Sequence, residues 1–187
     1  GIIAINLAEG DELLQVELTN GSDEIVLGAS NGKAIRFKET DCRALGRSAT
    51  GVIGMRFGED DHIIGAAIAK PNEEILVITE NGFGKRSSID EYRLQNRGGQ
   101  GVKTVNVTEK NGKLTALRAV DDNKDLIITT DKGVVIRIHV NEISKTGRST
   151  QGVRLIRLKD DQHISTIAIV DCVEDEPVIE NVENKQE

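Results

Sequence analysis

The chain has 187 residues, a formal net charge of −7 and an aromatic content of 2%, with no Trp. So few aromatic rings argue against a site that stacks nucleic-acid bases. The core has to be built from Val, Ile, Leu and Ala, which favours β-strands. By length alone the chain could be one domain or a part of one.

Cysteine usage and hydropathy narrow the class of protein further. Cys42 and Cys172 have no CxxC partner and no nearby pair of histidines, which argues against a zinc site or a disulfide framework. No apolar run reaches membrane-spanning length, and no charged segment typical of a signal peptide opens the chain. We therefore expect a reduced, cytoplasmic protein. Because the chain starts in mid-pattern without Met, we also expect it to be part of a longer protein.

The negative charge is concentrated at one end. Residues 174–187 contain six acidic residues and one lysine, so the remaining residues carry only −2 of the net charge of −7. We expect residues 174–187 to form a disordered acidic tail that interacts or autoinhibits, and a purely solubilising role fits equally well. The nearly neutral remainder leaves room for a basic face, so the net acidity does not exclude a nucleic-acid partner.

The sequence repeats with a period of about fifty residues. Four rows align, beginning at Gly1, Gly51, Gly101 and Gly152, and they divide the chain into the units 1–50, 51–100, 101–151 and, incompletely, 152–173. The residues that recur at fixed places are Gly32, Gly82 and Gly133, then Arg36, Arg86 and Arg137, then Arg47, Arg97 and Arg148. A period of this length is typical of propellers and other repeat architectures. We predict an all-β, propeller-like partial array of four-stranded blades.

Alternating apolar residues between turn signals predict short strands in every row. In the first row the expected strands are 2–7, 13–18, 25–27 and 34–37. Asn31-Gly32 predicts a hairpin with a type I′ turn, in which both central residues have positive φ. The later rows repeat this hairpin at 75–78 and 83–86, and at 126–128 and 134–138. Single helical turns are expected at 41–45 and 90–94, and each row supplies about four strands, the content of one blade.

Basic residues recur at two places in each row. In the strand after each hairpin they alternate with apolar residues, so we expect the aligned arginines on the solvated face. The second arginine lies in a loop of small residues, where a guanidinium and backbone N–H groups can approach a phosphate together. A single exposed arginine is most often plain solvated surface, but recurrence favours a shared role. The candidate DNA-binding residues are Arg36, Lys38, Arg47, Arg56, Lys85, Arg86, Arg97, Lys103, Arg137, Arg148, Arg154 and Arg157.

Three stretches carry a resemblance to a known family: Gly32–Glu39, Asn81–Arg86 and Gly147–Val153. They resemble the C-terminal domains of DNA gyrase A subunits, which are β-pinwheels of the bacterial type IIA topoisomerases. The resemblance covers the chain to about Cys172. It implies six blades that exchange strands with their neighbours, and duplex DNA wrapped around a basic rim. On that comparison the chain supplies the last three or four blades and the tail.

The same resemblance implies the setting of the domain. It implies a cytoplasmic, nucleoid-associated bacterial enzyme in which gyrase A, through its N-terminal domain, and gyrase B assemble as an A2B2 heterotetramer. ATP and Mg²⁺ belong to that holoenzyme, and no cofactor is expected in this chain. The wrapped DNA would allow the enzyme to introduce negative supercoils. The related topoisomerase IV subunit shares the fold, but the regular rows and the acidic tail favour gyrase.

One stretch is similar to the seven-residue box of that family. It comprises Gln95, Asn96, Arg97, Gly98, Gly99, Gln100 and Gly101. Asn96 and Gln100 stand where the box has basic residues, and two rows precede the stretch. We interpret it as a box-like loop on a later blade, with the box itself upstream of this chain. Whether this chain wraps DNA by itself is therefore open.

The sequence contains no evident catalytic set. The cleavage tyrosine of the resembled family lies in a separate domain, and Tyr92 lacks the arginine-tyrosine pairing that the family uses. The three histidines are isolated in sequence, so we expect surface or packing roles for His62, His139 and His163. Asp121-Asp122 and Asp160-Asp161 lack the spacing of a metal-binding loop, so no metal site is expected.

Two other functions stay open beside DNA binding. A propeller scaffold whose arginines face an acidic protein partner predicts weak binding to random duplex DNA. An enzyme domain with a site in a central channel is disfavoured, because the sequence offers no nucleophile with a base. Largely sequence-independent binding of duplex DNA through its phosphates is the function that the sequence favours.

Overall fold

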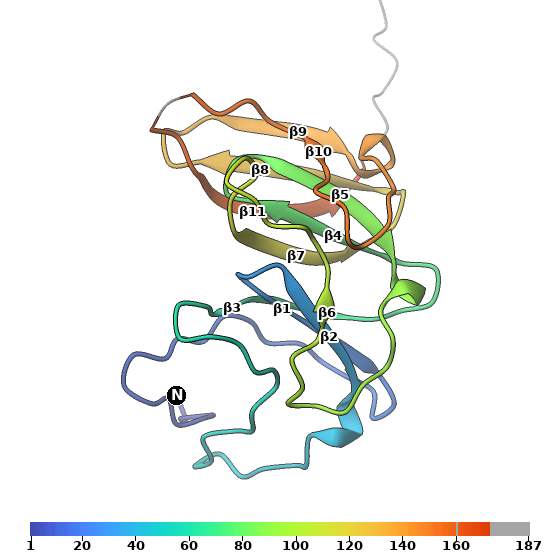
Figure 1. Cartoon of the computed structure of the whole chain (residues 1–187). Coiled ribbons are helices and arrows are strands. Elements are labelled where there is room, and N and C mark those ends of the chain that lie inside the picture. The colour runs from blue at the N-terminus through green and yellow to red at the C-terminus, as the bar shows by residue number, and fades with distance from the viewer. Residues whose placement is uncertain (160, 173–187) are drawn as a thin grey trace, which may run out of the picture.

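The computed structural model describes residues 1–159 and 161–172, so the tail expected at 174–187 lies outside the described residues. Three stacked antiparallel sheets make up the fold (Figure 1). The first sheet has the order β3-β1-β2-β6 and comprises β1 (Glu24–Ala29), β2 (Lys33–Lys38), β3 (Ile63–Ile68) and β6 (Val102–Lys103). The second has the order β10-β5-β4-β7 and comprises β4 (Glu74–Thr79), β5 (Phe83–Ser88), β7 (Leu114–Val120) and β10 (Val153–Arg154). The third has the order β11-β8-β9 and comprises β8 (Lys124–Thr130), β9 (Val135–His139) and β11 (Ile164–Asp171).

Each sheet is built around a hairpin at a turn signal of the sequence. β1 pairs with β2, β4 with β5 and β8 with β9, which confirms the predicted hairpins. The turn is not the expected type I′. The Gly32 N–H donates to the Ala29 carbonyl at 3.0 Å, and of Asn31 and Gly32 only the glycine has positive φ, at 79°. A three-residue loop with glycine in the left-handed region also suits a hairpin, and Gly82 and Gly133 repeat it with φ of 78° and 79°.

A sheet and a sequence row are different units. One edge strand of each sheet, β3, β7 or β11, comes from the row after its hairpin, and we call these the inner strands. The short strands β6 and β10, which we call the outer strands, come from one row further on. Gly152 shows why glycine opens a row: its φ is 80°, and a Cβ there would meet the Gly84 carbonyl oxygen at 2.7 Å. Only glycine permits so close an approach in this conformation.

The two strands expected at 2–7 and 13–18 are not formed, since residues 1–20 contain no strand. Segment 13–18 has the place in its row that β3 and β7 have in theirs, and those strands pair with the hairpin of the preceding row. No hairpin precedes residue 13 in this sequence, so the backbone of segment 13–18 has no hairpin strand with which to form hydrogen bonds. Its apolar side chains are exposed, Leu18 to 93%. Alternation predicts a strand only where a pairing partner exists.

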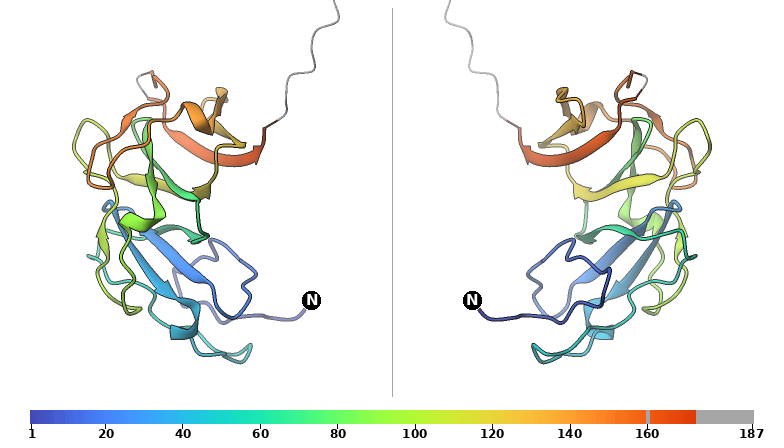
Figure 2. Two further views of the ribbon diagram at one scale, coloured as in Figure 1. Left: turned by 90° about the vertical axis from the view of Figure 1, so that its right-hand side faces the viewer. Right: turned by 90° about the vertical axis from the view of Figure 1, so that its left-hand side faces the viewer.

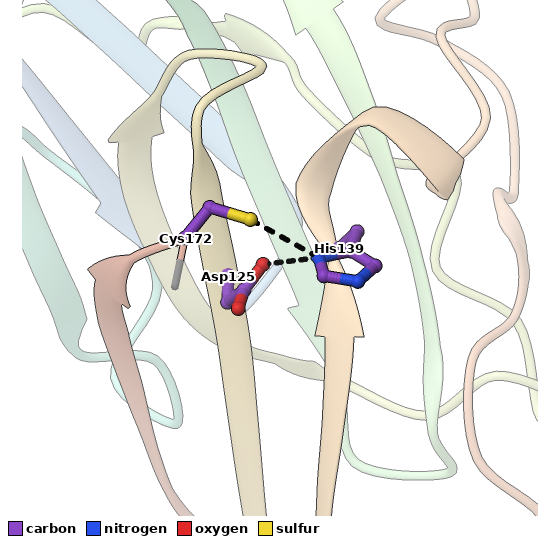
Figure 3. A group of neighbouring side chains, drawn as sticks. All are labelled: Asp125, His139 and Cys172. Atoms are coloured by element: carbon purple, nitrogen blue, oxygen red, sulfur yellow. Dashed lines mark hydrogen bonds and ion pairs between the residues drawn. The ribbon is translucent and has the colours of Figure 1, made fainter. Parts of the chain in front are cut away.

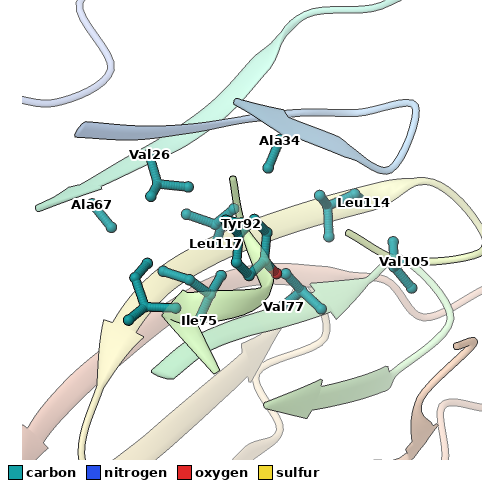
Figure 4. Close-up of a cluster of buried hydrophobic side chains, with 10 residues drawn as sticks. Val26, Ala34, Ala67, Ile75, Val77, Tyr92, Val105, Leu114 and Leu117 are labelled. Carbon is teal, nitrogen blue, oxygen red and sulfur yellow. The ribbon is translucent and has the colours of Figure 1, made fainter. Parts of the chain in front are cut away.

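Apolar clusters join the sheets to one another. The cluster between the first and second sheets includes Tyr92 and Leu117 (Figure 4). Tyr92 is 1% exposed and its hydroxyl lies 2.5 Å from Thr104 Oγ1. Burial raises the pKa of Tyr92 to about 12. A second cluster, which includes Leu76 and Leu126, joins the second sheet to the third. Aliphatic side chains supply most of both clusters, as the composition predicted.

The stacked sheets form a curved array with two distinct sides (Figure 2). β3 contacts β7 and β7 contacts β11, so the inner strands share one side, and the outer strands β6 and β10 lie at the opposite sheet edges. A single 3-10 turn follows each hairpin, close to the turns expected at 41–45 and 90–94: η1 (Glu39–Asp41), η2 (Ile89–Glu91) and η3 (Val140–Glu142). Within residues 1–159 and 161–172, no helix is long and apolar enough to cross a membrane.

Candidate nucleic-acid interface

The first arginine column has a structural role. Arg86, on β5, is 6% exposed. Its guanidinium pairs with Glu74 at 2.7 Å and with Asp122. It also donates to the carbonyls of Asn141 and Ile143, in and just after η3, at 3.1 and 2.8 Å. The expected solvated face is wrong for Arg86, because the next repeat covers the side of β5 to which the arginine points.

The other members of this column repeat the ion pair with more exposure. Arg36 pairs with Glu24 at 2.6 Å and donates to two carbonyls in and just after η2, and its side chain is 19% exposed. Arg137 pairs with Asp125, and its side chain is 46% exposed. In each row the acid stands twelve residues before the arginine, at Glu24, Glu74 and Asp125. This recurrence could have identified the ion pairs from the sequence.

Lys85 is also withdrawn from solvent. It is 0% exposed, and its Nζ donates to the Gly147 carbonyl at 2.7 Å and to Ser87 Oγ at 3.1 Å. Burial lowers the pKa of Lys85 to about 8. The sequence predicted a phosphate ligand here, but an ammonium group enclosed by protein acceptors is inaccessible to DNA. Lys85 and Arg86 are therefore removed from the candidate DNA-binding set.

The second arginine column connects loops of successive rows. Arg97 and Arg148 are half-buried, whereas Arg47 is exposed. The acceptors of the guanidinium groups are the carbonyls of Asp41 and Ile53 for Arg97, and of Glu91 and Lys103 for Arg148. The two Nε donors lie 3.0 and 3.1 Å from their acceptors. Each of these guanidinium groups uses part of its donor capacity within the protein, which leaves fewer N–H groups for a phosphate.

The box-like loop lies against the segment that follows the second row's opening. The Arg56 N–H donates to the Gly99 carbonyl at 2.9 Å, and the Arg56 Nε donates to the Gly98 carbonyl at 3.1 Å. Asn96 and Gln100, which stand where the family's box is basic, are exposed. The loop therefore presents polar amides where cations would bind DNA more strongly, and two of its carbonyls already accept hydrogen bonds from the protein.

Accessible cations gather at the outer strands. Lys103 on β6 and Arg154 on β10 are exposed, and the two strands have equivalent places in the first and second sheets. Lys33 is directly opposite Lys103 in the pairing of β2 with β6. Arg154 and Lys110 lie over the Phe83 ring, 5.1 and 5.7 Å from its centroid. Lys33 and Lys110 were missed in the sequence, because strand pairing and a shared ring bring them to this surface and no repeat marks them.

We call these four residues the rim cations: Lys33, Lys103, Lys110 and Arg154. The remaining accessible candidates from the sequence are Lys38, Arg47, Arg56, Arg137 and Arg157. The outer strands lie across the array from the inner strands (Figure 2). The candidate cations therefore divide into a structural set between the sheets and an accessible set that includes the outer edge.

Hairpin-centred sheets that exchange strands across a fifty-residue repeat define a propeller-type repeat domain, here with a basic outer edge. The family model for the DNA gyrase C-terminal domain, a β-propeller, matches residues 1–20, 23–70, 73–121 and 124–171. The chain belongs to this family, which confirms the resemblance and the predicted fold class. The last three matched units each run from a hairpin to the next inner strand, so they share the period of the rows but not their starting points.

Two relatives in sequence are gyrase A subunits. The DNA gyrase A subunit of Halalkalibacterium halodurans is 66% identical over 176 residues, which are 94% of this chain and 21% of that protein. The DNA gyrase A subunit of Klebsiella oxytoca is 44% identical over 177 residues, which are 94% of this chain and 20% of that protein. The chain thus spans about a fifth of the length of these relatives.

Solved structures show the same fold. The C-terminal domain of DNA topoisomerase IV matches with a TM-score of 0.85 and 26% identity, over 90% of this chain and 53% of that one. A DNA gyrase A C-terminal domain matches with a TM-score of 0.83 and 24% identity, over 90% of this chain and 58% of that one. Structural likeness does not separate gyrase from topoisomerase IV, but the more identical relatives above are gyrase subunits.

Proposed function

We propose that this chain binds and bends duplex DNA as part of a gyrase A subunit. The observation that supports this most is the recurrence of an exposed cation on equivalent outer strands, Lys103 and Arg154, each with a second cation beside it. Side chains of this kind contact phosphates and position DNA without reading its sequence. Bending a site of about 20–30 base pairs costs on the order of 1–6 kcal/mol, so cations of several sheets have to act together.

Within the whole enzyme, the bent DNA would present a crossing segment for strand passage and thereby allow negative supercoiling. The domain would then act beside the gyrase A N-terminal domain and gyrase B in an A2B2 assembly that uses ATP and Mg²⁺, at the nucleoid of a bacterial cytoplasm. The names of the sequence relatives favour gyrase over topoisomerase IV for this role.

Fluorescence anisotropy with a labelled random duplex across a salt series tests the proposal. If the four rim cations each contact a phosphate, the slope of log affinity against log salt is about −3.6 or steeper, at about −0.9 per contact. Fluorescence energy transfer between the two ends of the same duplex should rise on binding, since bending brings the ends together.

The scaffold function makes the opposite prediction. If the basic surface serves an acidic protein partner, the random duplex binds weakly even at low salt, and end-to-end energy transfer stays at the value of unbound DNA. That pair of results would exclude the proposed function. Binding with a steep slope but without bending would retain the phosphate contacts and exclude the wrap.

A further inference from the structure

Three side chains of types that can bind metal ions converge at one end of the third sheet (Figure 3). Asp125 is on β8, His139 ends β9, and Cys172 follows β11. Asp125 Oδ1 lies 2.6 Å from His139 Nδ1, and Cys172 Sγ lies 3.5 Å from the same nitrogen. One ligand atom of each residue lies within 4.8 Å of the other two. The expectation that His139 is isolated is wrong, because pairing of the strands joins residues far apart in sequence.

The donor atoms are of the kinds that zinc prefers. A thiolate, an imidazole nitrogen and a carboxylate oxygen suit a borderline-soft divalent cation, whereas Mg²⁺ and Ca²⁺ select oxygen donors. Around a tetrahedral ion with Zn–S of about 2.3 Å and Zn–N of about 2.0 Å, the sulfur and nitrogen are about 3.5 Å apart. Sγ of Cys172 and Nδ1 of His139 already have that separation, 3.5 Å. Oδ1 of Asp125 would move outward by about 0.7 Å as the ion replaces the proton between it and the imidazole.

The carboxylate is held in position from its other oxygen. Asp125 is 0% exposed, and Arg137 Nε donates to its Oδ2 at 2.6 Å, which leaves Oδ1 toward His139. Hydrogen bonds of this kind orient metal-binding carboxylates. His139 and Cys172 are exposed, so a cation can enter from solvent and water can complete its coordination.

The first and second sheets carry other residues at these places. The residue paired with the acid of the hairpin is Lys38 in the first sheet and Ser88 in the second. Cys172 lies two residues after Val170, the partner of Asp125 on β11. In the second sheet the equivalent residue is Asp122, two residues after the β7 partner of Glu74, and it pairs with Arg86. Since the repeat folds with these substitutes, sheet formation does not require the imidazole and the thiol of the third sheet. Their convergence indicates a ligand.

We propose that Asp125 Oδ1, His139 Nδ1 and Cys172 Sγ form a binding site for Zn²⁺, with water as the fourth ligand. The ion would connect β8, β9 and the end of β11, and would thereby couple the stability of the third sheet to metal binding. The site stands on these three side chains and does not rest on the proposed DNA binding.

Co²⁺ is a suitable probe, because a thiolate ligand gives a charge-transfer absorption that carboxylates alone do not. Titration of the intact, reduced chain with CoCl₂ should produce this absorption with one equivalent of metal, and Zn²⁺ should abolish it by displacement. Cys172→Ser removes the absorption. Cys42→Ser is the matched control, since Cys42 is the other exposed cysteine, and it retains the absorption.

Calorimetry with Zn²⁺ supplies the second readout. His139→Gln and Cys172→Ser should each weaken binding by more than the 10–100-fold that loss of a supporting partner typically causes. Both residues are exposed, so the variants should remain folded, and circular dichroism spectra that match the wild type would show this. A charge-transfer band that survives in Cys172→Ser, or Zn²⁺ affinities that are equal in Cys172→Ser and Cys42→Ser, would overturn the proposal.

Discussion

Lys85 is fully buried, so its protonation is coupled to folding. Burial lowers its pKa to about 8, whereas the pKa of an exposed lysine is about 10.4. Between these values the unfolded chain binds more protons than the folded chain, and stability therefore rises with pH. This gain in folding stability is fully present above about pH 10.4 and is lost as the pH falls through about 8.

Replacement of Lys85 by Met isolates this effect. Urea unfolding at pH 7 and at pH 10 should show that the free energy of unfolding of the wild type, relative to Lys85→Met, increases at the higher pH. Lys70→Met is the control, because Lys70 is an exposed lysine. If the difference between wild type and Lys85→Met is the same at both pH values, the buried amine does not titrate as described.

Arg86 and Arg36 test the structural role of the first arginine column. Arg86→Met removes the buried partner of the Glu74 carboxylate and leaves only the exposed Lys145 beside it. Loss of one partner of a buried pair typically costs about 3–5 kcal/mol. Arg36→Met should cost less, because the side chains of Arg36 and Glu24 are 19% and 26% exposed. Chemical denaturation measures both values. Equal losses of unfolding free energy in the two variants would contradict the burial argument. If Arg86→Met is folded but binds DNA more weakly, Arg86 would again be a DNA-binding candidate.

At the scale of elements, the short outer strands depend on the glycine before them. Gly152→Ala should combine the cost of a left-handed residue, about 1–2 kcal/mol, with the overlap between the new Cβ and the Gly84 carbonyl oxygen 2.7 Å away. Gly133→Ala is the control, since its φ of 79° matches the 80° of Gly152 but nothing lies within 4 Å of its Cβ. Denaturant unfolding should find Gly152→Ala the less stable. Similar stabilities would mean that β10 is not held by close packing.

The hairpins and the period were predictable because they depend on local signals. Apolar alternation on both sides of a turn glycine marks each hairpin, and Gly32, Gly82 and Gly133 adopt the left-handed conformation that the turn needs. Strand 13–18 was wrongly predicted, because its formation depends on a partner from another row. The same limit explains Arg86: alternation gives the side of the strand, but only tertiary packing decides whether that side is solvated.

The candidate sites were predictable only in part. Lys103 and Arg154 recur in register after a row-opening glycine, and the sequence therefore identified them as candidates. Lys33 and Lys110 do not recur, and they reach the outer edge through strand pairing and the Phe83 ring. His139 and Cys172 are 33 residues apart, and no spacing rule for metal ligands joins them before the third sheet is assembled.

At the scale of the whole molecule, the two sets of cations occupy different places. Arg36 and Arg86 connect the first and second hairpins to the turn of the next repeat and so hold the sheets in a curved array. The rim cations lie on the outer strands of that array or beside them, where a duplex could contact more than one sheet. The geometry of the proposed interface therefore depends on residues that lie outside it.

The salt dependence of DNA affinity in matched double variants tests this division most directly. Lys103→Ala with Arg154→Ala removes two rim cations, and the slope of log affinity against log salt should become shallower by about 1.8. Lys70→Ala with Arg118→Ala removes the same charge from the inner side, since Lys70 follows β3 and Arg118 is on β7. This double variant should leave the slope of log affinity against log salt nearly unchanged. Equal changes in the two double variants would contradict the account, because they would mean that net charge, rather than the outer edge, governs DNA binding.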